Sequence, residues 1–108
     1  MDFSLNLPSS KNKLIDLATK YDDFPKYLPD QIKSVDIIEK TSSYTITEET
    51  LHLSSVISKS FIQQTKHYAL QNDILKSEIL SGPAKGSIIE ITFSEIDVGT
   101  SVHANIDV

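Results

Sequence analysis

Apolar and polar residues alternate strictly near both ends of the chain. Residues 3–7 read Phe-Ser-Leu-Asn-Leu, and residues 101–108 alternate polar with apolar side chains throughout. Successive side chains of a strand point to opposite faces of its sheet. The alternation therefore predicts a strand near each end of the chain, each with one apolar and one polar face.

After Pro8 the apolar spacing lengthens to that of an amphipathic helix, which Ser9 or Ser10 can cap. The apolar stripe of this helix consists of Leu14, Leu17, Ala18 and Tyr21. A second short helix is predicted behind Asp22-Asp23, because aspartate is a good cap and Pro25 is tolerated in a first turn.

From Ile32 onward, β-branched residues and short turns predict about six further strands. They cover residues 32–40, 44–53, 56–70, 74–80, 89–94 and 101–108. Short turns imply antiparallel neighbours, so the predicted fold class is α+β. In the segment 44–53 we assign Ile46 and Glu48 to the inward face. The apolar parity then slips to Leu51, which predicts a bulge near Glu49-Thr50.

The charge balance argues against a polyanionic partner. All ten basic residues are lysines, against fifteen acidic residues, and the net charge is -5. A nucleic-acid binder needs a basic face, and arginine is the residue that grips phosphate in two places. We therefore expect no nucleic-acid partner.

The length and the absence of cysteine narrow the class of protein further. A chain of 108 residues fits a single domain spanning residues 1–108. The N-terminus lacks the basic start and apolar run of a signal peptide, and no stretch approaches the ~18 apolar residues of a membrane span. We expect a cytoplasmic protein with no transmembrane segment and no disulfide.

Ionisable side chains offer few candidates for catalysis. His52, His67 and His103 have no second ligand at a metal-binding spacing, and no serine lies in a nucleophile motif. We therefore expect no metal, no cofactor and no catalytic residue. His67 and Glu48 are the only inward candidates for acid-base chemistry.

Two segments carry a family resemblance. Residues 14–29 end in Tyr-Asp-Asp-Phe-Pro-Lys-Tyr-Leu-Pro and lead into Ile-Lys-Ser-Val, and residues 79–86 read Ile-Leu-Ser-Gly-Pro-Ala-Lys-Gly. Together with Phe93 in the strand that follows, they resemble the START and birch-pollen-allergen-like helix-grip superfamily (SRPBCC). Within it the chain looks like the polyketide cyclase and lipid-transport group, and most like its coenzyme-Q-binding START-like proteins.

This resemblance implies an α+β helix-grip fold. We therefore expect a curved antiparallel sheet of about seven strands, with two short helices after the first strand. Members of that superfamily normally end in a long C-terminal helix, whereas this sequence stops at Val108 while the alternation still runs, so we expect either a short protein or a domain truncated at its C-terminus. The apolar face that such a helix covers would then need another cover, and a homodimer is the expected one.

The resemblance also implies binding or carriage of an apolar small molecule, such as a lipid or a polyisoprenoid quinone, in a cavity between sheet and helices. One alternative is a cyclase or dehydratase acting on a polyketide-like substrate. A second is a protein-interaction module that uses the apolar concave face. We favour carriage over an enzyme, because the predicted inward positions are nearly all apolar.

The predicted cavity residues come from the helices and from the inward face of the sheet. They are Tyr21, Tyr27, Leu28, Ile46, Phe61, Ile89, Ile91, Phe93, Val102, Ala104 and Ile106. The inward assignment of Phe61 is the weakest of them. The apolar residues Val56, Ile62 and Tyr68 of the same predicted strand favour the opposite face as the inward one.

Overall fold

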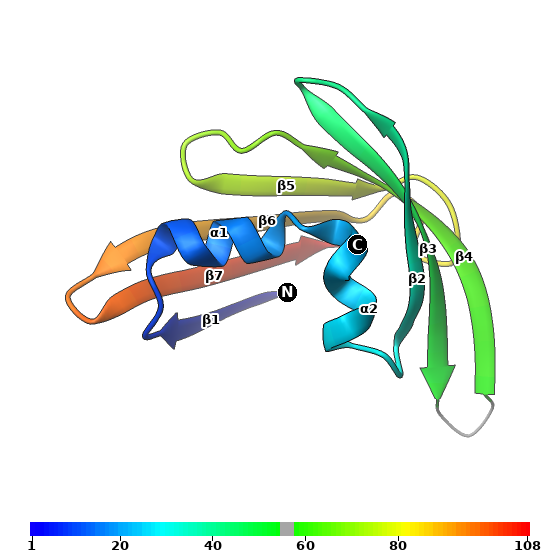
Figure 1. The fold of residues 1–108 in the computed structure, drawn as a ribbon, viewed down its shortest axis with the longest axis horizontal. Coiled ribbons are helices and arrows are strands. Elements are labelled where there is room, and N and C mark those ends of the chain that lie inside the picture. Colours follow the sequence, from blue (N-terminus) through cyan, green and yellow to red (C-terminus); the bar gives the residue numbers. More distant parts are fainter. Residues whose placement is uncertain (55–57) are drawn as a thin grey trace.

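The computed structural model describes residues 1–54 and 58–108, so the predicted parity marker Val56 lies outside the described residues. Its elements follow the order predicted from the sequence (Figure 1). They are β1 (Asp2–Leu7), α1 (Lys11–Ala18), the 3-10 helix η1 (Tyr21–Asp23), α2 (Phe24–Tyr27), β2 (Ile32–Lys40), β3 (Tyr44–Ser54), β4 (Ser58–Tyr68), β5 (Ile74–Ile79), β6 (Ile88–Ile96) and β7 (Gly99–Asp107).

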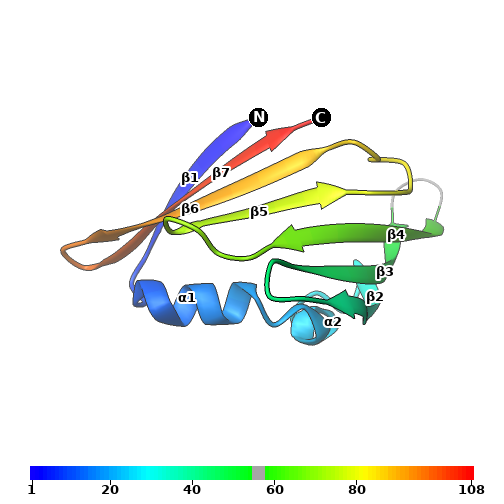
Figure 2. The ribbon, with the colours of Figure 1, turned by 90° about the horizontal axis from the view of Figure 1, so that it is seen from above.

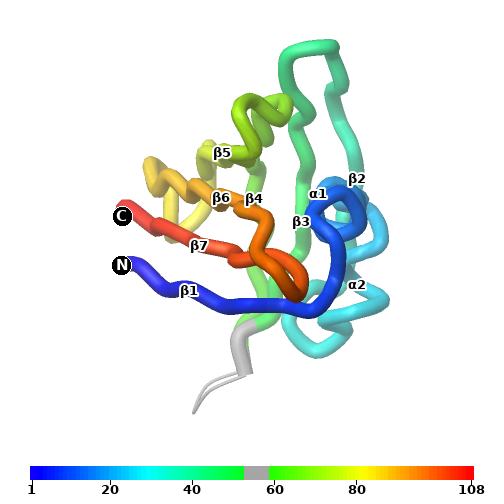
Figure 3. The backbone as a smooth tube through the Cα atoms, turned by 90° about the vertical axis from the view of Figure 1, so that its left-hand side faces the viewer, coloured from blue at the N-terminus to red at the C-terminus, as the bar shows by residue number. Residues whose placement is uncertain are grey.

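The strands form one antiparallel sheet of seven strands in the order β1-β7-β6-β5-β4-β3-β2. The sheet is curved, and both helices lie on the same side of it (Figure 2). The first and last strands are neighbours, which brings the two chain ends together (Figure 3). The predicted α+β fold, a curved open sheet with two short helices, is confirmed. No helix among the described residues is long and apolar enough to cross a membrane.

The first helix begins where the sequence predicts and ends earlier. Ser10 is its N-cap, and the Ser10 hydroxyl accepts a hydrogen bond from the backbone N–H of Lys13 at 3.3 Å. At the other end the Thr19 hydroxyl donates to the carbonyl of Ile15 at 2.9 Å. Tyr21, the last member of the predicted stripe, therefore lies in η1, and this brings its ring over the sheet.

The predicted bulge at Glu49-Thr50 is wrong. Strand β3 pairs with β4 without interruption, and the irregular register lies on β2, around Lys33 and Ile38. The parity does not slip, because the inward face of β3 is polar first and apolar only from Leu51. The prediction fails because it takes the inward face of β3 to be apolar along its whole length.

Gly99 fixes the junction between β1 and β7. Its φ of 139° lies in the region that favours glycine, and an added Cβ would lie 2.0 Å from the carbonyl oxygen of Leu7. Nearby, the side chain of Thr100 is fully buried, and its hydroxyl donates to the carbonyl of Ser9 at 2.9 Å. These contacts hold the start of α1 against the sheet, so that the helix crosses the concave face.

Candidate functional site

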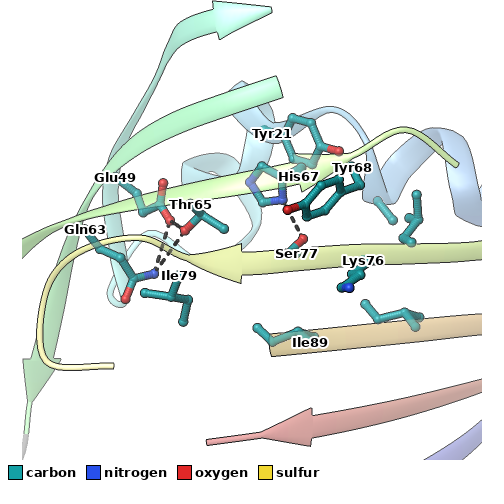
Figure 4. Close-up of a pocket in the computed structure, with 13 residues that line it drawn as sticks. Tyr21, Glu49, Gln63, Thr65, His67, Tyr68, Lys76, Ser77, Ile79 and Ile89 are labelled. Carbon is teal, nitrogen blue, oxygen red and sulfur yellow. Dashed lines mark hydrogen bonds between the residues drawn. The ribbon is translucent and has the colours of Figure 1, made fainter. Parts of the chain in front are cut away.

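The concave face of the sheet divides into a polar and an apolar half. The polar half carries the polar inward side chains of β3, β4 and β5, among them Thr47, Glu49, Gln63, Thr65, His67 and Ser77. Most of these line a pocket of about 200 Å³ beneath Tyr21 (Figure 4). Aliphatic side chains of β5 and β6, among them Ile79 and Ile89, close its other side. The pocket therefore offers both hydrogen-bonding groups and apolar surface.

Glu49 is the centre of a buried hydrogen-bond cluster. One carboxylate oxygen accepts from the hydroxyl of Thr47 at 2.8 Å. The other accepts from the hydroxyl of Thr65 and from the side-chain amide of Gln63, the latter at 3.2 Å. Three donors compensate the carboxylate for the water it loses on burial. This explains why a glutamate is stable on an inward position of the sheet.

His67 continues this cluster towards β5. Its Nε2 lies 3.0 Å from the hydroxyl oxygen of Thr47, and its Nδ1 lies 2.7 Å from the hydroxyl oxygen of Ser77. Thr47 has one hydroxyl proton and donates it to Glu49, so it can only accept from His67. Nε2 therefore carries the imidazole proton, and Nδ1 accepts the hydroxyl proton of Ser77. The result is one directional chain from Ser77 through His67 and Thr47 to Glu49.

Tyr21 covers the imidazole of His67. The two rings stack with their centroids 4.0 Å apart and an angle of 13° between their planes. Burial lowers the pKa of His67 from 6.5 to about 4, because the charged imidazolium would lose its water. His67 is consequently neutral near pH 7, in the form that accepts a proton. Burial also raises the pKa of Tyr21, so its phenol keeps its proton.

The apolar half is a groove of about 370 Å³ between α1 and strands β6 and β7. It is lined by Leu7, Leu14, Leu17, Ala18, Tyr27, Ile91, Phe93 and Val102. Ala18 and Ile91 also line the polar pocket, so the two depressions are contiguous. Together they form one concave surface with a polar end and an apolar end.

The structure brings most of the predicted cavity residues to this surface. Ile89, Ile91 and Phe93 of β6 pair with Ile106, Ala104 and Val102 of β7, on the face that α1 covers. Tyr21 lines the polar pocket and Tyr27 the groove. Phe61 shares the inward face of β4, since it lies two positions before Gln63. Leu28 is 48% exposed and lines neither depression.

The inward assignment of Ile46 and Glu48 is wrong. Both lie between the inward residues of β3 and therefore point to the opposite face of the sheet. There Glu48 accepts a hydrogen bond from the amide of Gln64 at 3.0 Å. The physical reason is the cluster around Glu49, which makes a polar side chain stable where an apolar one was expected.

Five polar residues of the site were missed from the sequence. They are Thr47, Glu49, Gln63, Thr65 and Ser77. The signal that could have found them is a pairing: a polar run on odd positions of β3 opposes a polar run on odd positions of β4. In this polar half the described residues contain no group of three or more acidic or histidine side chains placed to hold a metal ion.

Comparison with known proteins identifies the fold. No protein-family model matches the chain, and no curated protein matches it. It is similar to the di-domain ARO/CYC protein BexL from the BE-7585A biosynthetic pathway, with a TM-score of 0.85 and 12% identity. It is also similar to the di-domain ARO/CYC protein StfQ from the steffimycin biosynthetic pathway, with a TM-score of 0.82 and 11% identity.

Both matches cover 98% of this chain, but 34% and 35% of the matched chains. The chain thus spans about a third of the length of these solved structures. At such identities the likeness concerns the fold alone, and that fold is the helix-grip fold expected from the sequence.

Proposed function

We propose that this protein binds a small, largely apolar molecule with an oxygen-bearing end and moves a proton on it, as a cyclase or dehydratase does. The observation that carries the proposal is the neutral His67 in the pocket, whose Nδ1 is held as a proton acceptor. The apolar groove would receive the carbon chain, and the contiguous pocket would receive the oxygen-bearing end.

The chemistry that this arrangement supports is an internal aldol closure with loss of water. His67 would take a proton from a carbon next to a carbonyl group, and the resulting carbanion would attack a second carbonyl carbon of the same molecule. The new alkoxide would regain the proton from the imidazolium, and a second transfer would release water. The likeness to two ARO/CYC proteins supports this alternative over carriage alone.

Carriage without chemistry is the second candidate, and the groove favours it. Its lining is almost wholly aliphatic and aromatic, which suits a lipid or a quinone-like tail. The closeness to coenzyme-Q-binding START-like proteins, the cytoplasmic location and a homodimer built on the apolar face stay predictions of the sequence.

Binding is tested with N-phenyl-1-naphthylamine, a neutral fluorophore that brightens in apolar sites. Ile91→Asp places a carboxylate where groove and pocket meet and should abolish uptake, because a buried unpaired charge is costly. Ile62→Asp is the matched control, since Ile62 lies on the opposite face of the sheet and is exposed. Circular dichroism checks that both variants keep their strands. Equal uptake by both variants would contradict a ligand site here.

Catalysis is tested with a linear aliphatic diketone that can close to a cyclohexenone, followed by its ultraviolet absorbance. His67→Gln should lower the rate by about 10²–10⁴-fold, the usual contribution of a general base. His103→Gln, which changes an exposed histidine of β7, should leave the rate unchanged. Fluorophore uptake without any His67-dependent cyclisation would select carriage.

A further inference from the structure

Ser77 occupies the pocket end of the directional hydrogen-bond chain. Its hydroxyl oxygen lies 2.7 Å from Nδ1 of His67, and its side chain lines the pocket together with Ile79 and Ile89 (Figure 4). A nucleophile and its base typically lie within this hydrogen-bond distance of each other. The neutral imidazole has its lone pair on Nδ1, which is the atom that would receive the serine proton.

A third group orients the base, as nucleophilic catalysis requires. Thr47 joins Nε2 of His67 to the carboxylate of Glu49 through contacts of 3.0 and 2.8 Å. This relay fixes the tautomer of His67 and places a negative charge where imidazolium formation needs compensation. It has the same order of groups as a serine, histidine and carboxylate triad, with one hydroxyl inserted.

A second serine-histidine pair shows that the distance alone is not the argument. The hydroxyl oxygen of Ser4 lies 2.7 Å from Nδ1 of His103, and Nε2 of His103 lies 3.6 Å from the carboxylate of Asp2. That group lies on the exposed face of β1 and β7, where water competes for every contact. The hydrogen-bond chain that starts at Ser77 differs from this exposed pair, because it borders a cavity that is contiguous with an apolar groove.

We propose that Ser77 is a nucleophile towards esters of apolar acyl groups, so that the protein is also an acyl transferase or esterase. The ester would occupy the same cavity as the ligand of the proposed function. The reaction is a different one, because Ser77 breaks an ester bond. Tyr21 and Lys76 both line the pocket and carry donors that an oxyanion would need.

Ester cleavage by Ser77 needs the ester and one molecule of water as reactants. The Ser77 oxygen attacks the ester carbonyl carbon while His67 Nδ1 takes the serine proton. The tetrahedral intermediate collapses, the carbon-oxygen bond to the alcohol breaks, and the imidazolium returns its proton to the leaving alkoxide. Water then attacks the acyl-serine, gives its proton to His67, and releases the carboxylic acid as the proton returns to Ser77.

The test uses p-nitrophenyl butyrate and intact-mass spectrometry followed by peptide mapping. The expected result is release of p-nitrophenol with a butyryl group on Ser77. Ser77→Ala should lower release to the rate without protein, whereas Ser4→Ala, the matched variant of the exposed pair, should leave it unchanged. A butyryl group only on lysines, or an unchanged rate in Ser77→Ala, would overturn the proposal.

A thiol version keeps the test independent of turnover. The chain has no cysteine, so Ser77→Cys and Ser4→Cys each introduce one thiol. Ser77→Cys should react with p-nitrophenyl butyrate at least tenfold faster than Ser4→Cys, and the added His67→Gln change should remove the difference. Equal rates for the two thiols would overturn the role of His67. Fluorophore uptake and diketone cyclisation by the parent protein separate this result from a failure of the proposed function. If both are present while no ester is cleaved, the role of Ser77 as a nucleophile is overturned and the proposed function stands.

Discussion

The two halves of the concave face stabilise their buried side chains in different ways. In the polar half, the described side chains that are buried all have hydrogen-bond partners, and Thr47 is only 1% exposed. In the apolar half, Phe93 is 4% exposed, while Phe3 and Leu5 at the sheet edge are each 54% exposed. The buried polar side chains thus satisfy one another by hydrogen bonds around the pocket, whereas the apolar half leaves apolar side chains exposed beyond α1. The two halves therefore differ in what a substitution removes: a hydrogen-bond partner in the polar half, and packed apolar surface in the apolar half.

The largest effect should come from the apolar half, at its most buried aromatic residue. Phe93→Ala should lower the free energy of unfolding by about 3–5 kcal/mol, because it removes transfer energy and leaves a cavity. Urea unfolding measures the change. Phe3→Ala is the matched control and should cost much less, since Phe3 lies half exposed on β1. Similar losses in the two variants would mean that the apolar half does not pack around Phe93.

The burial of Phe93 could be predicted from the sequence, whereas the inward position of the polar residues around Glu49 could not. Phe93 belongs to an alternation over residues 89–94 in which the inward residues Ile89, Ile91 and Phe93 are all apolar, and burial follows directly from that pattern. Glu49 is inward for a reason that no single strand contains. Its three donors come from β3 and β4, and only the pairing of these strands brings them together.

The same limit explains the errors at Ile46 and Glu48. Within β3 alone, the apolar Ile46 is the better choice for the inward face. The cost of burying Glu49 disappears only when Gln63 and Thr65 are placed opposite or diagonal to it. Ser77 was missed in the same way, because its partner His67 is on the neighbouring strand.

The next effect belongs to the polar half and depends on pH. The pKa of His67 falls from 6.5 in the unfolded chain to about 4 in the fold. Between these pH values the unfolded chain binds the proton and the folded chain does not. The free energy of unfolding therefore falls as the pH drops from 6.5 towards 4, by about 3 kcal/mol for this group.

Urea unfolding of the protein and of His67→Gln over this pH range isolates the contribution, and His103→Gln is the control. The other titratable groups around His67 in the described residues include Tyr21 from η1, Glu49 reached through Thr47, and Tyr68 and Lys76 at the pocket rim. Their contributions are common to both proteins and cancel in the difference. If His67→Gln shows the same slope as the parent, the imidazole is not desolvated in the fold.

A smaller effect concerns the cluster around Glu49. Glu49→Ala should cost about 1–3 kcal/mol, because the hydroxyl of Thr65 and the amide of Gln63 lose their acceptor. Thr65→Val in addition should recover part of this loss, since removing both partners of a buried bond is less costly than removing one. The double-mutant cycle should give a coupling of about 0.5–3 kcal/mol. Strict additivity would show that the two side chains do not interact.

The smallest effect tests the link that Thr47 makes between Nε2 of His67 and the carboxylate of Glu49. Thr47→Val keeps the shape of the side chain and removes its hydroxyl, so it should cost about 1 kcal/mol. Its more informative consequence is for the tautomer of His67. Without Thr47, Nε2 of His67 has no acceptor that fixes its proton, and Ser77 can hydrogen-bond either tautomer.

Nitrogen NMR of the histidine side chains distinguishes these states, because protonated and unprotonated ring nitrogens have well-separated shifts. The parent and Thr47→Ser should show a single tautomer with the proton on Nε2, and Thr47→Val should show a mixture. His103 serves as the internal reference, since Thr47 is remote from β7 in the sheet. If Thr47→Val keeps the tautomer of the parent, Ser77 alone orients His67, and the relay to Glu49 has no part in preparing the base.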